Sequence, residues 1–316
     1  MTPWSAAVFG RAAVFGRAAC SAFATVLLSV VVSAPVQAQY DVVTRANVEY
    51  VVHDGVKLSG NFYAPKGLAK APVVIAVHGG GWQNGTRENW NHVAPYLAKK
   101  GIAVLAISYR LGKAGIYPKE VYDVKSAVQF VRAKAADLSV DPDRIGLMGG
   151  SAGGHLVALA GLAHDQFTSE YRNDPHATTP AHVKAVVAFY GVFDMVAQWQ
   201  HDQIARPRDQ ITEKFLGLSP MQNRRIYFEA SPMSYATIGE NRPRFLLVHG
   251  TEDDVVDPLT QSVPFQVALK QAGIPANRVV IPGAAHGFAS DPFESDPSGP
   301  MAIALPRVAR FLEGGL

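Results

Sequence analysis

Six short apolar runs, most of them without polar alternation, constrain the fold of this chain more than any other feature. Runs of this kind suit strands that are buried on both faces, as in a parallel sheet. Segments with helical spacing lie between them. Alternating strands and helices predict an α/β fold in which helices cover both faces of a mostly parallel sheet. The runs span 72–77, 102–108, 144–149, 183–191, 244–250 and 278–283.

The helix that follows Pro118 is the most regular. Its apolar residues recur every three or four positions and form one stripe, which suits a helix packed on a sheet. The polar residues Lys119, Glu120, Lys125 and Arg132 lie outside this stripe. The stripe consists of Val121, Val124, Val128, Val131, Ala135 and Leu138. Residues 259–272 and 301–312 are two further predicted helices.

The segment 39–316 is expected to form one domain. It opens with two partly alternating segments, 42–52 and 56–65, and the residues His53-Asp54-Gly55 between them predict a hairpin. No linker rich in Pro, Gly or Ser interrupts 40–316. Residues 195–240 break the strand and helix alternation, which predicts a small helical excursion, similar to a cap, at one end of the sheet.

The first 38 residues differ in kind from the rest. They contain Arg11 and Arg17 but no Lys, Asp or Glu, followed by an apolar run over 21–34 and small residues up to Ala38. This pattern predicts a secretory signal peptide cleaved after Ala38, and the run is short for a membrane span. Its removal takes away Cys20, the only cysteine, and lowers the net charge from +3 to +1. A periplasmic or extracellular protein is expected, with no stable membrane insertion and no nucleic-acid partner.

The sequence GGSAGGH, residues 149–155, stands between a predicted strand and a predicted helix. Gly149, Ser151 and Gly153 fit the pattern G-x-S-x-G, a tight turn that raises a serine hydroxyl above the end of a sheet. A serine needs a base to act as a nucleophile, and the base needs an acid that orients it. On such a fold the acid and then the histidine follow the serine along the chain.

Both partners are present in the expected order. His286 lies in a short loop after the last predicted strand and before Gly287, whereas His249 and His155 are expected to pack against neighbouring elements. The acid follows the run 244–250, and Asp253 is the preferred candidate, with Asp254 as its rival. Glu252 and Asp257 are the remaining candidates there.

A second glycine-rich turn, HGGGW, follows the first of the six runs. The amides of Gly80 and Gly81, with the amide of Ala152 after the serine, are expected to surround a developing oxyanion. The serine turn, the acid, the histidine and this glycine-rich turn occur together, with the first three in the expected chain order, and predict a serine hydrolase. No cluster of His, Cys and carboxylates at ligand spacing argues for a metal, and no cofactor is expected.

These motifs resemble the α/β-hydrolase superfamily, and within it the bacterial esterases grouped with feruloyl and acetyl-xylan esterases, which are related to hormone-sensitive-lipase-like carboxylesterases. The resemblance covers about residues 45–312 and rests on HGGGW, GGSAGGH, HGTED and AAHGF. It implies an eight-stranded sheet, a Ser-Asp-His triad and hydrolysis of carboxylic esters without a cofactor. By the family pattern the acid is Asp253. The sequence VVDP, where many relatives have Val-Pro, blurs the register and keeps Asp254 open.

The sequence motifs constrain the substrate less than they constrain the catalytic residues. Trp82, Tyr190 and Trp199 are candidate substrate-binding residues, because aromatic rings suit a phenolic acyl group or a sugar. The expected activity is a secreted carboxylesterase acting on short-acyl, acetyl or feruloyl esters, which include small molecules and esters of plant polysaccharide. An amidase, an aryl-formamidase or an oligopeptide-cleaving relative is the alternative on the same fold. A hydrolase-fold binding protein without activity is the second alternative.

Overall fold

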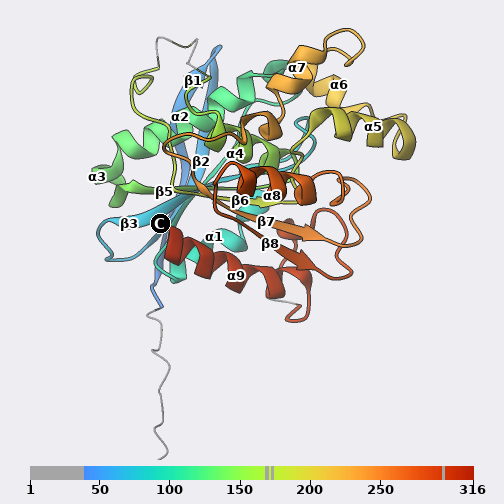
Figure 1. The fold of residues 1–316 in the computed structure, drawn as a ribbon. Coiled ribbons are helices and arrows are strands. Elements are labelled where there is room, and N and C mark those ends of the chain that lie inside the picture. Colours follow the sequence, from blue (N-terminus) through green and yellow to red (C-terminus); the bar gives the residue numbers. More distant parts are fainter. Residues whose placement is uncertain (1–38, 168–170, 172–173, 294–295) are drawn as a thin grey trace, which may run out of the picture. The chain divides into compact units, whose positions relative to one another are not determined.

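A computed structural model describes residues 39–167, 171, 174–293 and 296–316, all of which belong to one structural unit (Figure 1). The predicted signal peptide, residues 1–38, lies outside the described residues. Among the described residues, no helix combines the length and apolar character that a membrane crossing requires.

An eight-stranded sheet forms the centre of this unit, with the spatial order β1-β2-β4-β3-β5-β6-β7-β8. The strands are β1 (Val42–His53), β2 (Val56–Pro65), β3 (Ala71–Val77), β4 (Ala103–Ile107), β5 (Val140–Gly150), β6 (Ala185–Phe189), β7 (Arg244–Gly250) and β8 (Ala276–Ile281). The pairs β1–β2 and β2–β4 are antiparallel, and every other neighbouring pair is parallel. The predicted hairpin and the mostly parallel α/β sheet are confirmed.

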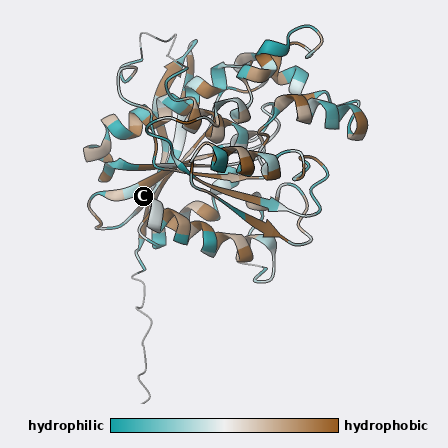
Figure 2. Ribbon diagram, viewed as in Figure 1, coloured by the Kyte–Doolittle hydropathy of each residue, from teal (hydrophilic) through white to brown (hydrophobic). Residues whose placement is uncertain are grey.

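Helices cover both faces of the sheet. The α-helices are α1 (Val93–Lys99), α2 (Lys119–Ala133), α3 (Ala135–Leu138), α4 (Ala152–Leu162), α5 (Met195–Ala205), α6 (Ile211–Leu216), α7 (Arg224–Glu229), α8 (Ser262–Gln271) and α9 (Pro300–Gly315). Short 3₁₀ turns are η1 (Arg87–Trp90), η2 (Gly112–Gly115), η3 (Pro232–Tyr235) and η4 (Phe288–Ser290). Figure 2 shows apolar colour along the strands, whereas α9 carries both colours because only one of its sides is buried.

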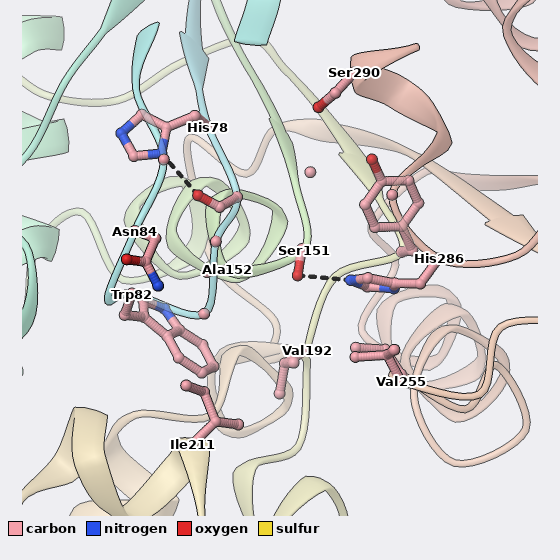
Figure 3. Close-up of a pocket in the computed structure, with 18 of the residues that line it drawn as sticks. His78, Trp82, Asn84, Ser151, Ala152, Val192, Ile211, Val255, His286 and Ser290 are labelled. Atoms are coloured by element: carbon pink, nitrogen blue, oxygen red, sulfur yellow. Dashed lines mark hydrogen bonds between the residues drawn. The ribbon is translucent and has the colours of Figure 1, made fainter. Parts of the chain in front are cut away.

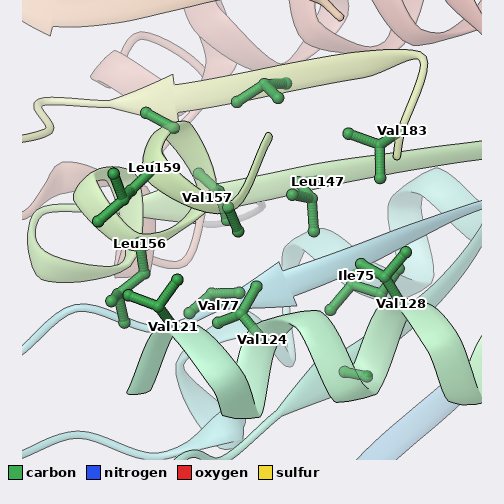
Figure 4. Close-up of a cluster of buried hydrophobic side chains, with 14 of the residues drawn as sticks. Ile75, Val77, Val121, Val124, Val128, Leu147, Leu156, Val157, Leu159 and Val183 are labelled. Atoms are coloured by element: carbon green, nitrogen blue, oxygen red, sulfur yellow. The ribbon is translucent and has the colours of Figure 1, made fainter. Parts of the chain in front are cut away.

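Two hydrophobic clusters lie on opposite faces of the sheet because successive side chains of a strand point to opposite sides. In β3, Ile75 and Val77 pack with α2 and α4, as Figure 4 shows. Val74 and Ala76, the alternate residues of the same strand, belong to the cluster that contains α1 and α9. A strand such as β3, buried on both faces, has no polar alternation in its sequence.

Two polar residues of α2 that lie outside its apolar stripe are nevertheless buried. Glu120 is fully buried and Lys125 is nearly so. The ammonium group of Lys125 donates to the carbonyl oxygen of His164 at 2.7 Å and to that of Phe167. Chain beyond α4 therefore covers Lys125, whereas Glu120 lies against η2, where a Cβ at Gly115 would come within 3.1 Å of its Oε1. The spacing of apolar residues within α2 reveals neither contact.

Between β6 and β7 the chain makes the excursion predicted for 195–240. It contains α5, α6, α7 and η3, which lie beyond one end of the sheet in Figure 1. The excursion begins where the carboxylate of Asp194 accepts the amides of Val196 at 2.9 Å and Ala197 at 3.0 Å. This cap satisfies amides that lack partners at a helix start.

Candidate active site

Ser151 stands at the junction of β5 and α4, where the chain reverses sharply. Its backbone has φ 56° and ψ −122°, a strained conformation for a residue with a side chain. Its amide donates to the carbonyl oxygen of Phe189 at 2.9 Å, which fixes the turn against β6. A Cβ at Gly153 would lie 2.2 Å from the carbonyl oxygen of Val77, so only glycine fits there. The turn raises the hydroxyl of Ser151 above the carboxyl ends of the strands.

His286 lies beside Ser151, although 135 residues separate them in the sequence. The hydroxyl of Ser151 is 2.9 Å from Nε2 of His286, as the dashed line in Figure 3 marks. Nδ1 of the same ring donates to Oδ2 of Asp253 at 2.8 Å. The structure thus brings the three predicted residues into one chain of hydrogen bonds, within the reach that proton transfer requires.

The carboxylate of Asp253 is buried and held by several donors. Its Oδ1 accepts the amides of Val255 at 3.1 Å and Val256 at 2.9 Å, and Nε2 of His249 lies 3.2 Å from Oδ2. Burial alone would raise the pKa of this carboxyl. The hydrogen bonds from His249 and His286 outweigh it and hold the pKa well below its usual range. Asp253 is therefore ionised at neutral pH.

The other candidate acids lie apart from His286. Asp254 is exposed, and its carbonyl oxygen accepts Nε2 of His201 at 2.8 Å. Asp257 caps the following turn through the amide of Leu259 at 2.9 Å, and Glu252 is exposed. The extra residue in VVDP does not move Asp253 away from His286. The carboxylate of Asp253 accepts the amides of Val255 and Val256 and so fixes the start of this turn.

The glycine turn after β3 forms the opposite wall of the site. Gly80, Gly81 and Trp82 have consecutive positive φ angles of 110°, 59° and 59°. A Cβ at Gly80 would lie 2.2 Å from the carbonyl oxygen of Asn84, so the turn needs glycine there. The start of this turn is fixed by His78, whose Nδ1 donates to the carbonyl oxygen of Gly79 at 2.7 Å.

The three residues predicted to stabilise an oxyanion come together around Ser151. Gly80, Gly81 and Ala152 all line the same cavity as Ser151 and His286. Ala152 is the first residue of α4, so its amide has no partner within the helix. Such amides are the donors that an oxyanion hole uses.

The cavity above Ser151 has a volume of about 430 Å³. In Figure 3, Trp82, Val192, Ile211 and Val255 lie together on one side of Ser151, and Ser290 lies on the other. The side chain of Ile211 packs directly on Gly81, where a Cβ would come within 2.9 Å of its Cδ1. The excursion thus supplies an apolar wall next to the glycine turn.

Two of the three predicted substrate-binding aromatics reach this cavity. Trp82 and Tyr190 line it, and the ring of Tyr190 lies 4.7 Å from the ring of His286. The hydroxyl of Tyr190 accepts the amide of Ala289 at 3.0 Å, which ties down the loop that follows His286.

The prediction for Trp199 is wrong. Its indole N–H donates to Glu213 Oε1 at 2.7 Å, and the ring packs against the core of the excursion and not in the cavity. Val192, Ile211 and Val255 are wall residues that sequence reasoning missed. Val192 and Val255 lie in irregular segments and Ile211 begins the short helix α6, so no periodic pattern marks their side chains as inward.

The described residues contain no group of three or more His, Cys, Asp or Glu side chains arranged to hold a metal ion. The polar groups around Ser151 instead form a relay of donors and acceptors beside an apolar cavity. Such an arrangement suits nucleophilic attack on a carbonyl carbon.

Comparisons with known proteins find similarity to several esterases. The chain is 32% identical over 237 residues to esterase LipC of Mycobacterium tuberculosis, which covers 74% of this chain and 57% of LipC. It is 29% identical over 241 residues to a probable isoprenylcysteine alpha-carbonyl methylesterase of Oryza sativa subsp. japonica, covering 75% of this chain and 56% of that protein. The chain spans about half the length of the curated relatives it matches.

Solved structures match over nearly the whole chain. Esterase 2 of Thermogutta terrifontis with butyrate bound has a TM-score of 0.68 and 27% identity, covering 89% of this chain and 95% of that one. A truncated carbohydrate esterase from gut microbiota has a TM-score of 0.70 and 25% identity, covering 90% and 99%.

The sequence profile of the BD-FAE family matches residues 61–269, which include Ser151 and Asp253. The fold and the family resemblance expected from the motifs are therefore confirmed. The chain belongs to the BD-FAE family of α/β-hydrolases.

Proposed function

We propose that this chain is a serine carboxylesterase in which Ser151 is the nucleophile, His286 the general base and Asp253 the acid that orients the imidazole. The observation that carries the proposal is the pair of contacts of His286, at 2.9 Å to Ser151 and 2.8 Å to Asp253. The named esterases among its relatives support the same reaction class.

The reaction follows from these contacts. Oγ of Ser151 attacks the ester carbonyl carbon while Nε2 of His286 takes the hydroxyl proton. The carboxylate of Asp253 stabilises the imidazolium that forms. The amides of Gly80, Gly81 and Ala152 bind the negative oxygen, and the imidazolium then protonates the leaving alkoxide. Water, activated by the same histidine, releases the acid from the acyl-enzyme.

The acyl group is proposed to be short and to occupy the apolar side of the cavity. Trp82, Val192, Ile211 and Val255 lie there, whereas Ser290 and Asn89 line the cavity elsewhere and suit an alcohol that carries hydroxyl groups. Structural neighbours hold propionate and butyrate, and another is a carbohydrate esterase. Acetyl and feruloyl esters of plant polysaccharide are the natural substrates to examine first.

A substrate panel tests the reaction class. It compares p-nitrophenyl esters from acetate to decanoate, acetylated xylan, methyl ferulate and an N-formyl arylamine. Turnover of acetate and butyrate esters is expected, with little turnover of the formamide. The Ser151→Ala variant should fold like the wild type and lose ester turnover by several orders of magnitude. Retained turnover in Ser151→Ala contradicts the proposal, and preferred turnover of the formamide favours an aryl-formamidase.

The acyl site has its own test at Ile211. Ile211→Ala enlarges the apolar side of the cavity and should raise kcat/KM for octanoate relative to acetate by about 10-fold or more, the scale on which hydrophobic pockets discriminate chain length. Ile204→Ala is the matched control, since Ile204 lies in the same excursion but is 86% exposed. An unchanged ratio in Ile211→Ala places the acyl chain elsewhere.

Secretion is proposed from the sequence pattern of residues 1–38. When the full chain is expressed in a bacterium, the exported protein is expected to begin at Gln39. Full-length protein that stays in the cytosol contradicts this proposal.

A further inference from the structure

A buried histidine on the nucleophile helix has both ring nitrogens engaged, although it has no part in the relay at Ser151. His155 is fully buried on α4. Its Nδ1 lies 3.2 Å from the indole nitrogen of Trp82, and its Nε2 lies 2.7 Å from the carbonyl oxygen of Ala230. An indole nitrogen only donates and a carbonyl oxygen only accepts. Nδ1 of His155 is therefore the acceptor, and Nε2 carries the proton.

These two hydrogen bonds join three parts of the site. Trp82 follows the glycine turn, His155 lies one helical turn after Ser151, and Ala230 directly follows α7 in the excursion. The amide of His155 also donates to the carbonyl oxygen of Ser151 at 3.0 Å. The position of the glycine turn is thereby fixed relative to the nucleophile helix by a side chain of that helix.

Aromatic packing leaves Trp82 little freedom around this bond. Its ring stacks on Phe215 of α6 with centroids 4.3 Å apart, and His155 meets both rings edge-on at 5.2 and 5.4 Å. Trp82 also has a φ of 59°, a costly angle for a residue with a side chain. Such an angle persists only where the surroundings hold the residue in place.

We propose that His155 is a positioning residue: by holding the indole of Trp82, it keeps the amides of Gly80 and Gly81 directed at the oxygen of the carbonyl group that Ser151 attacks. The peptide units of Gly80 and Gly81 directly precede Trp82, so a rotation of its backbone reorients them. Burial lowers the pKa of His155 to about 4, against the opposing hydrogen bond to Ala230, which keeps the ring neutral and able to accept. The proposal rests on the proposed esterase function.

Two substitutions separate the two bonds. In His155→Asn the side-chain oxygen stands near the position of Nδ1 and can accept from Trp82, whereas the bond to Ala230 is lost. In His155→Gln the amide nitrogen stands near the position of Nε2 and can donate to Ala230, whereas the acceptor for Trp82 is displaced. His201→Gln, on the half-exposed His201 of α5, controls for the loss of an imidazole.

The kinetic readout is the split between kcat and KM for p-nitrophenyl acetate. His155→Gln should lower kcat on the order of 10- to 100-fold with KM nearly unchanged, part of the 10²- to 10³-fold that the loss of one oxyanion donor costs. His155→Asn should retain more kcat than His155→Gln, and His201→Gln should match the wild type. Equal kcat losses in the Asn and Gln variants, or a loss confined to KM, overturn the proposal.

A spectroscopic readout does not depend on ester turnover. In protein labelled with ¹⁵N-glycine and ¹⁵N-tryptophan, His155→Gln should shift or broaden the indole resonance of Trp82 and the amide resonances of Gly80 and Gly81. His155→Asn should move them less. Unchanged glycine amides in His155→Gln refute the positioning role even if the wild type hydrolyses no ester. Absence of wild-type turnover with the predicted shifts refutes the esterase function alone.

Discussion

The acid sensitivity of this fold should depend measurably on His78, the residue that begins the glycine turn. His78 is fully buried, donates from Nδ1 to the carbonyl oxygen of Gly79 at 2.7 Å, and stacks on Tyr109 at 4.4 Å. Burial lowers its pKa from 6.5 to about 4, although the bond to Gly79 opposes the shift. In the His78→Asn variant the new side chain does not titrate, and its amide nitrogen can still donate to the carbonyl oxygen of Gly79.

The direction of this pH dependence follows from the number of protons that the folded and the unfolded chain bind. Between pH 6.5 and pH 4 the unfolded chain binds a proton at this site and the folded chain does not, so the free energy of unfolding falls as the pH is lowered through this window. One pKa unit corresponds to about 1.4 kcal/mol. Between pH 7 and pH 5 the loss from His78 alone is therefore about 2 kcal/mol, and it approaches about 3 kcal/mol near pH 4.

Urea unfolding at pH 7 and pH 5 measures this contribution. His78→Asn lowers stability at both pH values because packing is lost, so the informative quantity is the difference between them. That difference should be smaller in His78→Asn than in the wild type by about 2 kcal/mol. His53 contributes with the opposite sign. Burial alone would lower its pKa, but hydrogen bonds to Asp123 and Asp174 raise it overall, and its contribution is lost as the pH rises. It is present in both proteins and cancels. Equal differences in the two proteins would show that His78 contributes nothing to the pH dependence of stability.

Three further predictions concern the relay, the turn and the core. In p-nitrophenyl acetate assays, Asp253→Asn should lower kcat by about 10³- to 10⁴-fold, as expected for the acid of a triad, whereas Asp254→Asn should leave kcat unchanged. The reverse result would assign the acid to Asp254. Gly153→Ala places a Cβ against backbone and should lower Tm and abolish activity, whereas Gly314→Ala meets open space and should do neither; a stable, active Gly153→Ala variant contradicts the packing described for the turn. Arg110→Met leaves the buried carboxylate of Asp123 without its guanidinium partner and should cost about 3–5 kcal/mol in urea unfolding; a loss below about 1 kcal/mol would show that water or movement relieves the charge.

Much of the fold could be predicted because its main determinants are local. The run at 72–77 reflects β3, whose burial on both faces removes polar alternation, and the His53-Asp54-Gly55 turn reflects a hairpin. The burial of Glu120 and Lys125 could not be predicted in this way. Lys125 is covered by the segment after α4 and Glu120 by the turn η2 before α2, and no periodicity within α2 encodes either contact.

In the active site, too, the residues with local turn signals could be predicted, and those whose position depends on distant contacts could not. The glycines around Ser151 and the loop of His286 carry turn signals, so their positions could be predicted. The choice of Asp253 over Asp254 depends on a one-residue register that only the fold of the turn decides. The aromatic character of Trp199 and its place in the excursion suggest the cavity, but its indole instead donates to Glu213 outside the cavity.

The link between Trp82 and His155 could not be predicted from the sequence. The two residues lie 73 positions apart, and their contact requires the glycine turn and the helix α4 to pack side by side. Its place on the helix after Ser151 predicts that His155 faces a neighbouring element, but the sequence holds no signal for the partner.

Covalent labelling of the nucleophile is the most direct test of the role proposed for Ser151. The wild-type protein is incubated with diethyl p-nitrophenyl phosphate, and the modified residue is located by peptide mass spectrometry. We expect one diethyl phosphoryl group per chain, on Ser151, with ester hydrolysis lost in step with labelling and no label in Ser151→Ala. Full hydrolysis after labelling, or an inactivating label on another residue, would contradict the account.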